Sequence, residues 1–454
     1  MFSLTQNYLT RGFWGDEAWT SLISQLPYRE MLATTAADFH PPGYYTIIEL
    51  WYKIFPATEV STRIVSIVFY LATILMVFKL ASYVRGRQFG LLSAAVVATN
   101  PIFFTYAFEA RNYTMFAFAA TGSIFFLIEL SKQFTLRSAI AFILFSTLGI
   151  YTHYYMFFIL AAEFLYILLF ERKMLFAAIA AYFVVALLYL PWLPYLLGQL
   201  NSVAGDYWIG GIDRRTHYEA LLRILGGEHG NAIRPWLFSL SILLLIIGIA
   251  QHVLRHPEPN SRQEDGQAGR RFEKPYLLTW LWAIVPFILA TLPGFKIGDT
   301  HLPFRPIFFW RYLIGASVPL AMVMVHTAQK LKQPLFTLTM IGLITLSVAV
   351  DILTFTRSPY SFREVYRENI TAQIKPDDKI VTVLPSFAEV LYYRNRLGLD
   401  NDLVVLPEGL VQFSGKSLLD AYVENGVVTI SDDINVRYFE MRPGPSIKIT
   451  NYPN

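Results

Sequence analysis

The sequence contains no cysteine among its 454 residues. Disulfide bonds, thiolate catalysis and cysteine-ligated metal sites are therefore excluded. The sequence also lacks a glycine-rich phosphate loop, so it offers no support for direct use of ATP or of a Rossmann-bound cofactor. Any chemistry of this chain is left to oxygen and nitrogen side chains.

Charged residues are scarce as well, at 15% of the chain, whereas an ordinary soluble domain contains about 25%. Hydrophobic residues make up 54% and aromatic residues 16%. The apolar residues gather in runs of roughly 18 to 25, long enough to cross about 30 Å of hydrocarbon. The sequence therefore predicts an α-helical membrane protein with about ten transmembrane helices. Spans are expected at roughly 61–84, 90–108, 113–131, 138–152, 155–170, 174–199, 236–254, 276–294, 306–326 and 334–355.

The basic residues indicate how these spans are oriented. They lie in every second loop, around Arg85, Lys132, Arg172 and Lys330 and in the polar loop 255–275. Basic loops face the cytoplasm, so residues 1–60, the turns at 109–112 and 152–155, loops 200–235 and 295–305 and everything after about 356 are expected outside. The net charge of +4 is then a feature of membrane topology, and no nucleic-acid partner is expected.

Residues 356–454 differ from the rest of the chain. Strand-like runs lie at 380–384, 403–406 and 427–430, with helix-like segments at 386–397 and 415–424 between them. This alternation predicts a small α/β domain. We expect a transmembrane domain over 1–355, opening with an outer loop over 1–60, and an α/β domain over 356–454 outside the membrane.

Two adjacent carboxylates, Asp16 and Glu17, stand between Trp14 and Trp19 shortly before the first span. Carboxylates near hydrocarbon are costly and are usually retained for a function, although an acid pair in a solvated loop is often only a loop. At the outer interface this pair could meet a lipid headgroup on one side and a water-borne acceptor on the other.

Other polar motifs fall on the same outer side, and each also has a simpler reading. His40 precedes two prolines that suit a helix start, and the Thr-His-Tyr-Tyr turn around His153 is typical of an interfacial aromatic belt. Glu109 and Arg111, in a tight turn before Tyr113, could merely pair with each other, but arginine also forms two parallel hydrogen bonds to a phosphate. Arg311 and Tyr312 stand in an apolar run, where an arginine either snorkels or reaches a lipid phosphate.

The motifs at 16–19, 40–45, 109–113, 152–155 and 311–312 occur in an order that resembles glycosyltransferase family 39 and its bacterial relatives. These relatives include the dolichyl-phosphate-mannose protein mannosyltransferases and the aminoarabinose transferase of lipid A. The resemblance covers about residues 10–330. It implies the GT-C architecture, a multi-pass protein of the cell membrane, and an active site in outer loops.

The resemblance also implies a reaction. A sugar linked to a polyprenyl phosphate would be transferred, with inversion, to a lipid, glycan or protein acceptor. Asp16 would be the general base, with Glu17 beside it and Glu109 as a second acid. The substrate-binding residues would be His40, Arg111, Tyr113, His153, Arg311 and Tyr312. No cofactor is assigned and no residue is named as a metal ligand, although Asp16, Glu17 and His40 could hold a divalent ion.

One departure from the family concerns the start of the chain. Family members usually begin with a membrane helix, whereas here only about fifteen residues precede Asp16. The sequence therefore leads us to expect that a first helix is missing from this chain. Two other function classes stay open at this point: a transporter or flippase of lipid-linked sugars, and a polymerase or ligase of lipid-linked glycans.

Overall fold

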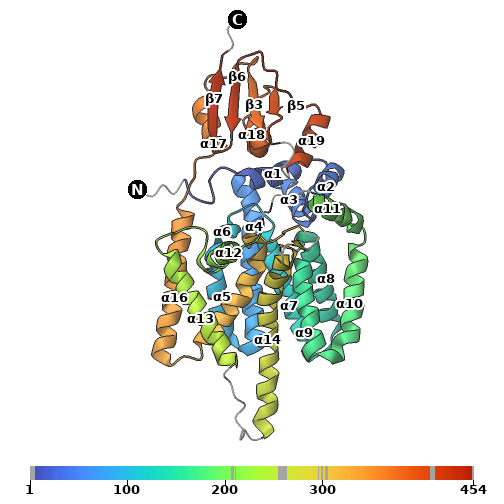
Figure 1. Cartoon of the computed structure of the whole chain (residues 1–454), viewed down its shortest axis with the longest axis vertical. Helices are drawn as coiled ribbons and strands as arrows, with labels where there is room; N and C mark the ends of the chain where they lie inside the picture. The colour runs from blue at the N-terminus through green and yellow to red at the C-terminus, as the bar shows by residue number, and fades with distance from the viewer. Residues whose placement is uncertain are drawn as a thin grey trace.

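The computed structural model of the chain describes residues 6–205, 209, 211–253, 263–294, 296–297, 300–301, 305–409 and 415–451. A bundle of long helices occupies one end of the molecule, a small sheet domain occupies the other, and short helices lie between them (Figure 1). The bundle contains α4 (Glu59–Arg85), α5 (Arg87–Ala98), α6 (Pro101–Ala107), α7 (Tyr113–Lys132), α8 (Leu136–Thr152), α9 (Met156–Phe170), η1 (Arg172–Met174), α10 (Leu175–Tyr189), α13 (Arg234–Val253), α14 (Gln263–Thr291), η2 (Leu292–Gly294), α15 (Ser317–Ala328) and α16 (Gln333–Phe355).

The helical membrane architecture with a small C-terminal α/β domain is confirmed, but the number of ten spans is not. Six of the described helices are long and apolar enough to cross a membrane, or seven if α5 and α6, which are bent by 65°, form one span. The two spans predicted at 138–152 and 155–170 correspond to two short apolar helices, α8 and α9, which are separated around His153.

The predicted span at 306–326 differs most from the structure. Residues 305–309 form no helix, a 3-10 helix η3 (Trp310–Ala316) follows, and the α-helix begins only at Ser317. Pro306 has no amide hydrogen to contribute to a helix. Arg311 instead points to the loop that carries Asp16, with 3.2 Å between Arg311 NH1 and Asp16 Oδ2.

The basic turns lie together at one end of the bundle. The Lys132 amine donates to the Tyr83 carbonyl at 3.2 Å, and Arg85 contacts His326, near the end of α15. The sheet domain lies at the opposite end (Figure 1). The turns around Lys132 and Arg85 are thus separated along the bundle from the sheet domain, and which side faces the cytoplasm stays a prediction.

A layer of short elements connects the two ends. It contains α1 (Gly15–Ile23), α2 (Tyr28–Ala36), α3 (Gly43–Tyr52), α11 (Leu193–Gly205), α12 (Arg214–Gly226), β1 (Lys296–Ile297) and β2 (Thr300–His301), the last two antiparallel. The 174–199 run is consequently divided between α10 and α11. Residues 15–52 fold into three helices that lie at the end of the bundle next to the sheet domain (Figure 1).

The C-terminal domain is a five-stranded sheet in the order β5-β4-β3-β6-β7. Its elements are α17 (Phe362–Val365), η4 (Tyr366–Ile370), β3 (Lys379–Val383), α18 (Leu384–Arg396), β4 (Leu403–Leu406), α19 (Lys416–Glu424), β5 (Val428–Ile430), β6 (Tyr438–Arg442) and β7 (Ser446–Thr450). Strands β5, β4, β3 and β6 run parallel, with Ile380 beside Leu403 and Phe439, and β7 is antiparallel to β6. The three predicted strands and two helices are present, and β6 and β7 were not predicted.

The sheet domain is packed firmly on the first loop. The Phe13 N–H donates to the Tyr393 hydroxyl at 2.7 Å, and that hydroxyl donates to Glu59 Oε1 at 3.1 Å. Phe13 and Tyr392 pack with ring centroids 4.9 Å apart. The division into residues 1–355 and 356–454 stays a prediction, and α16 ends at Phe355.

Candidate active site

The two acids of the first loop lie in the first turn of α1 but in different surroundings. Asp16 keeps 39% of its side chain exposed, whereas Glu17 is fully buried. Successive residues of an α-helix point about 100° apart. Neighbours in sequence therefore reach different neighbours in space, and the two carboxylates belong to two separate clusters.

Asp16 faces two arginines from distant parts of the chain. Its Oδ2 lies 3.2 Å from Arg311 NH1 and 3.8 Å from Arg111 NH2. Arg111 also reaches the Asp16 carbonyl at 3.4 Å and the Thr20 hydroxyl at 3.3 Å. The simpler alternative, an ion pair between the side chains of Glu109 and Arg111, is not found among the described residues, and the Arg111 guanidinium lies beside Asp16 instead.

His40 continues this cluster. Its Nε2 lies 3.2 Å from Arg111 NH2, and its Nδ1 lies 3.1 Å from Asp38 Oδ2. Because arginine can only donate, His40 Nε2 must accept, so we assign the ring proton to Nδ1 and a hydrogen bond to Asp38. Asp38 was missed by the sequence reasoning, although its position two residues before His40 was a usable signal.

Glu17 is the centre of the second cluster. Its Oε1 accepts from Arg63 Nε at 2.8 Å and from the Ala110 N–H at 2.9 Å, and its Oε2 accepts from Arg63 NH2 at 2.6 Å and Arg11 NH2 at 3.4 Å. Burial alone would raise the pKa of Glu17, but Arg11 and Arg63 outweigh it and the pKa is lowered. These contacts favour a structural role for Glu17.

Arg63 was also missed, although an arginine at the start of an apolar span indicates a buried partner. It is fully buried and also donates to the carbonyls of Leu9, Arg11 and Gly12 at 2.7, 2.7 and 3.1 Å. The Arg63 guanidinium thus fixes the shape of the loop that precedes Asp16.

Glu109 lies near both clusters, but within the described residues its carboxylate forms no hydrogen bond or ion pair with Asp16 or Arg111. Its Oε1 accepts from the Tyr8 hydroxyl at 2.8 Å and lies 3.6 Å from Arg11 NH2, while its Oε2 has no hydrogen-bond partner. Burial raises the pKa of Glu109 to about 7, with Arg11 opposing the shift. Glu109 is therefore poised to exchange a proton near neutral pH.

The remaining predicted residues form an aromatic wall beside His40. His153 lies at 5.0 Å from the rings of both Phe116 and Tyr312, and the buried Tyr113 packs edge-on against Tyr106 at 4.6 Å. Burial lowers the pKa of His153 to about 3, aided by His40 and Arg111. The neutral ring accepts from the Tyr155 N–H at Nδ1, 3.1 Å away, so its proton lies on Nε2.

Three cavities adjoin these clusters through shared residues. A narrow cavity of about 40 Å³ is lined by residues that include Asp16, His40, Arg111 and Glu389. An aromatic, mostly apolar cavity of about 290 Å³ is lined in part by His40, His153 and Tyr312. A more polar cavity of about 350 Å³ is lined in part by Glu109, Arg311 and Glu389. Asp16 itself lines the narrow cavity, which shares His40 with the apolar cavity and Glu389 with the polar one.

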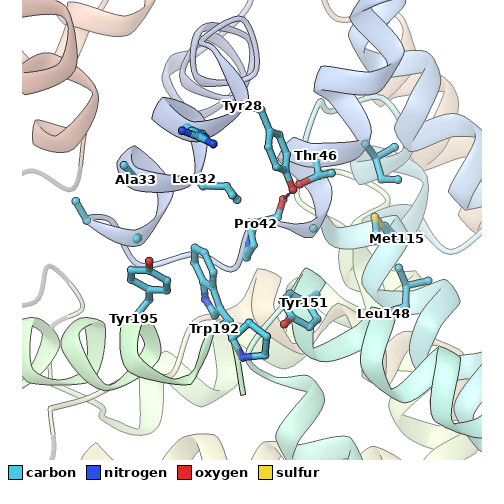
Figure 2. Close-up of a pocket in the computed structure, with 16 residues that line it drawn as sticks. Tyr28, Leu32, Ala33, Pro42, Thr46, Met115, Leu148, Tyr151, Trp192 and Tyr195 are labelled. Atoms are coloured by element: carbon cyan, nitrogen blue, oxygen red, sulfur yellow. Dashed lines mark hydrogen bonds between the residues drawn. The ribbon is translucent and has the colours of Figure 1, made fainter. Parts of the chain in front are cut away.

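A larger cavity of about 910 Å³ lies apart from the acids, among α2, α3, α8 and the chain around Trp192. Figure 2 shows Trp192 and Tyr151 on one side of it and Leu32 and Ala33 on another. None of the predicted site residues lines it, so we do not place the reaction there.

The suggestion of a metal ion held by Asp16, Glu17 and His40 does not fit this geometry. Both Glu17 oxygens are occupied by arginines and by a backbone N–H. Within the described ranges, no three histidine, aspartate or glutamate side chains gather as a metal would require. No step below involves a metal ion.

One known protein family matches part of this chain. Residues 39–197 match the model of the dolichyl-phosphate-mannose-protein mannosyltransferase family. Comparison with curated proteins gives no significant match.

Solved structures extend the likeness to nearly the whole chain. ArnT from Cupriavidus metallidurans bound to undecaprenyl phosphate is 12% identical, with 96% of this chain and 90% of that chain covered and a TM-score of 0.64. Its apo state gives 13% identity, 96% and 89% coverage and a TM-score of 0.62. The archaeal oligosaccharyltransferase AglB from Archaeoglobus fulgidus, in complex with an inhibitory peptide and a dolichol-phosphate, gives 13% identity, 98% and 71% coverage and a TM-score of 0.51. The chain thus has the GT-C fold of ArnT, and its residues 39–197 match the dolichyl-phosphate-mannose-protein mannosyltransferase family.

Proposed function

We propose that the chain is a membrane glycosyltransferase that moves a sugar from a polyprenyl phosphate to a hydroxyl acceptor on the outer face of the membrane. One observation carries this proposal above the others. The half-exposed Asp16 lies beside Arg111 and Arg311 and lines a narrow cavity that shares His40 with the aromatic apolar cavity and Glu389 with the polar cavity. Glycosyl transfer from a lipid phosphate needs a base, cations for the phosphate, and separate room for lipid and acceptor.

In the proposed reaction, Asp16 takes the proton of the acceptor hydroxyl as general base. The acceptor oxygen forms a bond to the anomeric carbon from the face opposite the phosphate, and the bond from that carbon to the phosphate oxygen breaks. The polyprenyl phosphate leaves with the bonding electrons, and the sugar configuration inverts. Arg111 and Arg311 stabilise the negative charge on the departing phosphate.

The donor is proposed to lie in the aromatic cavity. Its lining by His153, Tyr155 and Tyr312 suits a prenyl chain, and His40 connects it to Arg111. Undecaprenyl phosphate bound to ArnT and dolichol-phosphate bound to AglB support a polyprenyl-phosphate donor. His40, held by Asp38, keeps the Arg111 guanidinium directed toward Asp16, and Tyr113 forms part of the buried wall behind it.

The test is sugar transfer in liposomes, with native membrane lipid extract as the source of donors and mass spectrometry of lipids and glycans as the readout. Wild type should transfer a sugar, and Asp16→Asn should not. Asp402→Asn is the matched control, because it makes the same chemical change at a side chain that is 74% exposed. No transfer by wild type, or equal transfer by Asp16→Asn, would overturn the proposal.

A further inference from the structure

The polar cavity of about 350 Å³ is built by segments that are distant in sequence. The first loop contributes Tyr8 and Trp14, the turn before α7 contributes Glu109, and η3 contributes Trp310 and Arg311. The sheet domain closes the cavity with residues 359–362, Glu389 and Pro445. The C-terminal domain is thus part of the cavity wall.

Four residues of this wall carry a buried polar atom without a hydrogen-bond partner. These atoms are Trp14 Nε1, Glu109 Oε2, Arg311 Nε and Glu389 Oε2. A buried polar atom that is left unpaired costs about 1–3 kcal/mol, and four around one cavity are unusual. Terminal carboxyl torsions are broad, so both glutamates can turn toward a bound group. A ligand with several hydroxyl groups would satisfy these donors and acceptors.

Two of the three arginines in the described lining of the cavity already face carboxylates. Arg11 is paired with Glu17 and Glu109, and Arg311 is paired with Asp16. The third arginine, Arg357, lies 3.0 Å from His229. The cavity therefore offers carboxyl groups, indole rings and the unpaired Nε of Arg311 to a ligand, while each of its described arginines already has at least one partner. This combination suits a sugar, whose hydroxyls bond to carboxyl groups and whose ring packs on aromatic faces.

Glu389 connects the cavity to the reacting end of the site. It also lines the narrow cavity beside Asp16, and a methyl group added at Gly15 would lie 3.6 Å from its Oε1. Burial raises the pKa of Glu389 to about 8, and the Asp16 charge adds to the shift. At neutral pH the protonated carboxyl can both donate and accept a hydrogen bond.

We infer that this cavity binds a sugar unit of the acceptor, a glycan or glycolipid, and that Glu389 brings the C-terminal domain into the binding site. The assignment of this sugar to the acceptor rests on the proposed function, whereas the binding of a sugar does not. The described lining of this cavity shares no residue with the aromatic cavity assigned to the lipid, and Arg311, which lines it, contacts Asp16.

The experiment measures sugar binding without turnover. The full chain is placed in lipid nanodiscs, and methyl glycosides of mannose, glucose, galactose and N-acetylglucosamine are titrated one at a time by saturation-transfer NMR. The variants are Glu389→Ala and Glu389→Gln, and Glu424→Ala is the matched control on an exposed residue of the same domain. Thermal melting of each variant establishes that it is folded.

At least one glycoside should bind to wild type and to Glu424→Ala. Binding of the glycoside should weaken about tenfold or more in Glu389→Ala, because a sugar hydroxyl loses its buried hydrogen-bond partner. It should weaken less in Glu389→Gln, whose amide still forms hydrogen bonds. Glu389→Gln serves as the deciding variant if Glu389→Ala does not fold. The bound glycoside should remain when undecaprenyl phosphate is added.

Two results would overturn the inference. One is the absence of any glycoside signal in wild type, or a signal that both Glu389 variants leave unchanged. The other is displacement of the glycoside by undecaprenyl phosphate, which would assign the sugar to the donor site. Glycoside binding by a chain that transfers no sugar would leave the sugar site standing while the proposed function fails.

Discussion

Asp16 and Glu17 are neighbours in sequence, yet the regions around them are organised in opposite ways. The Glu17 region is closed, with both oxygens held by two buried arginines and a backbone N–H. The Asp16 region is open, with two arginines on one oxygen and cavities beside it. A buried charge without its partner is strongly destabilising, so we expect the first region to hold the loop in place, and we propose that the second binds the substrate.

The two adjacent carboxylates have different proposed roles, since Glu17 anchors the first loop and Asp16 acts as the base. Arg63 and Arg11 anchor Glu17 and several carbonyls of the first loop, and this fixes the start of α1. Asp16 directly precedes Glu17 in α1, so the contacts that hold Glu17 also fix the position of the Asp16 backbone. Precise placement of a catalytic group by a rigid neighbour is a general requirement of catalysis.

Asp16→Asn should give the largest effect. The substitution removes the general base while keeping nearly the same shape, and loss of a general base typically lowers the rate about 10²–10⁴-fold. Sugar transfer per folded molecule should fall by that factor, with the melting temperature close to that of wild type. Transfer within threefold of wild type would remove Asp16 from the proposed mechanism.

Glu17→Ala should act mainly on stability. It leaves Arg63 buried without a carboxylate, and breaking a buried ion pair costs about 3–5 kcal/mol. We expect a large drop in the melting temperature of the detergent-solubilised chain. Glu59→Ala, which removes a part-buried carboxylate 3.9 Å from Arg363, is the comparison, and an equal drop in both variants would contradict a special role for Glu17.

Arg111→Ala should reduce donor use by a smaller factor. A hydrogen bond to a charged group contributes about 1.5–3 kcal/mol, so kcat/KM for the lipid donor should fall roughly 10- to 100-fold. Arg111→Lys should recover only part of this loss, because the planar fork that also contacts His40 and Thr20 is absent. Unchanged donor kinetics in Arg111→Ala would exclude its proposed contact with phosphate.

Glu389→Gln should have the smallest effect, visible as a change with pH. The folded-state pKa of Glu389 is raised to about 8, above its unfolded value, so the stability linked to its proton is present at low pH and is lost as pH rises to about 8. The wild-type melting temperature should decline between about pH 4.5 and 8, and Glu389→Gln should decline less. Parallel curves would show that Glu389 does not keep its proton in the folded chain.

The long helices could be predicted from the sequence because apolar runs are long and continuous, as in α4 and α16. The structure of region 306–326 could not be predicted, because its apolar composition is typical of a span and gives no sign that Arg311 contacts Asp16. Strand β6 was missed because its alternating residues, such as the buried Phe439 and Met441, are interrupted by charged ones.

The polar motifs of the candidate site were recognisable, but their partners were not. Asp16, His40 and Arg111 do meet in space, as their predicted location on one side of the membrane suggests. The partners of Glu17 and Glu109 depend on how helices pack over long sequence separations, which no local pattern encodes. Glu389 gave no signal at all, because its place in the site follows from the docking of the whole C-terminal domain.

The division of labour between the two acids is tested most directly by measuring sugar transfer and thermal melting on the same preparations of Asp16→Asn and Glu17→Gln. We expect Asp16→Asn to melt like wild type and to lose transfer, and Glu17→Gln to melt at lower temperature while its folded fraction retains most of the transfer. A Glu17→Gln chain that melts like wild type and loses transfer as completely as Asp16→Asn would contradict the division and would place both carboxylates in the chemistry.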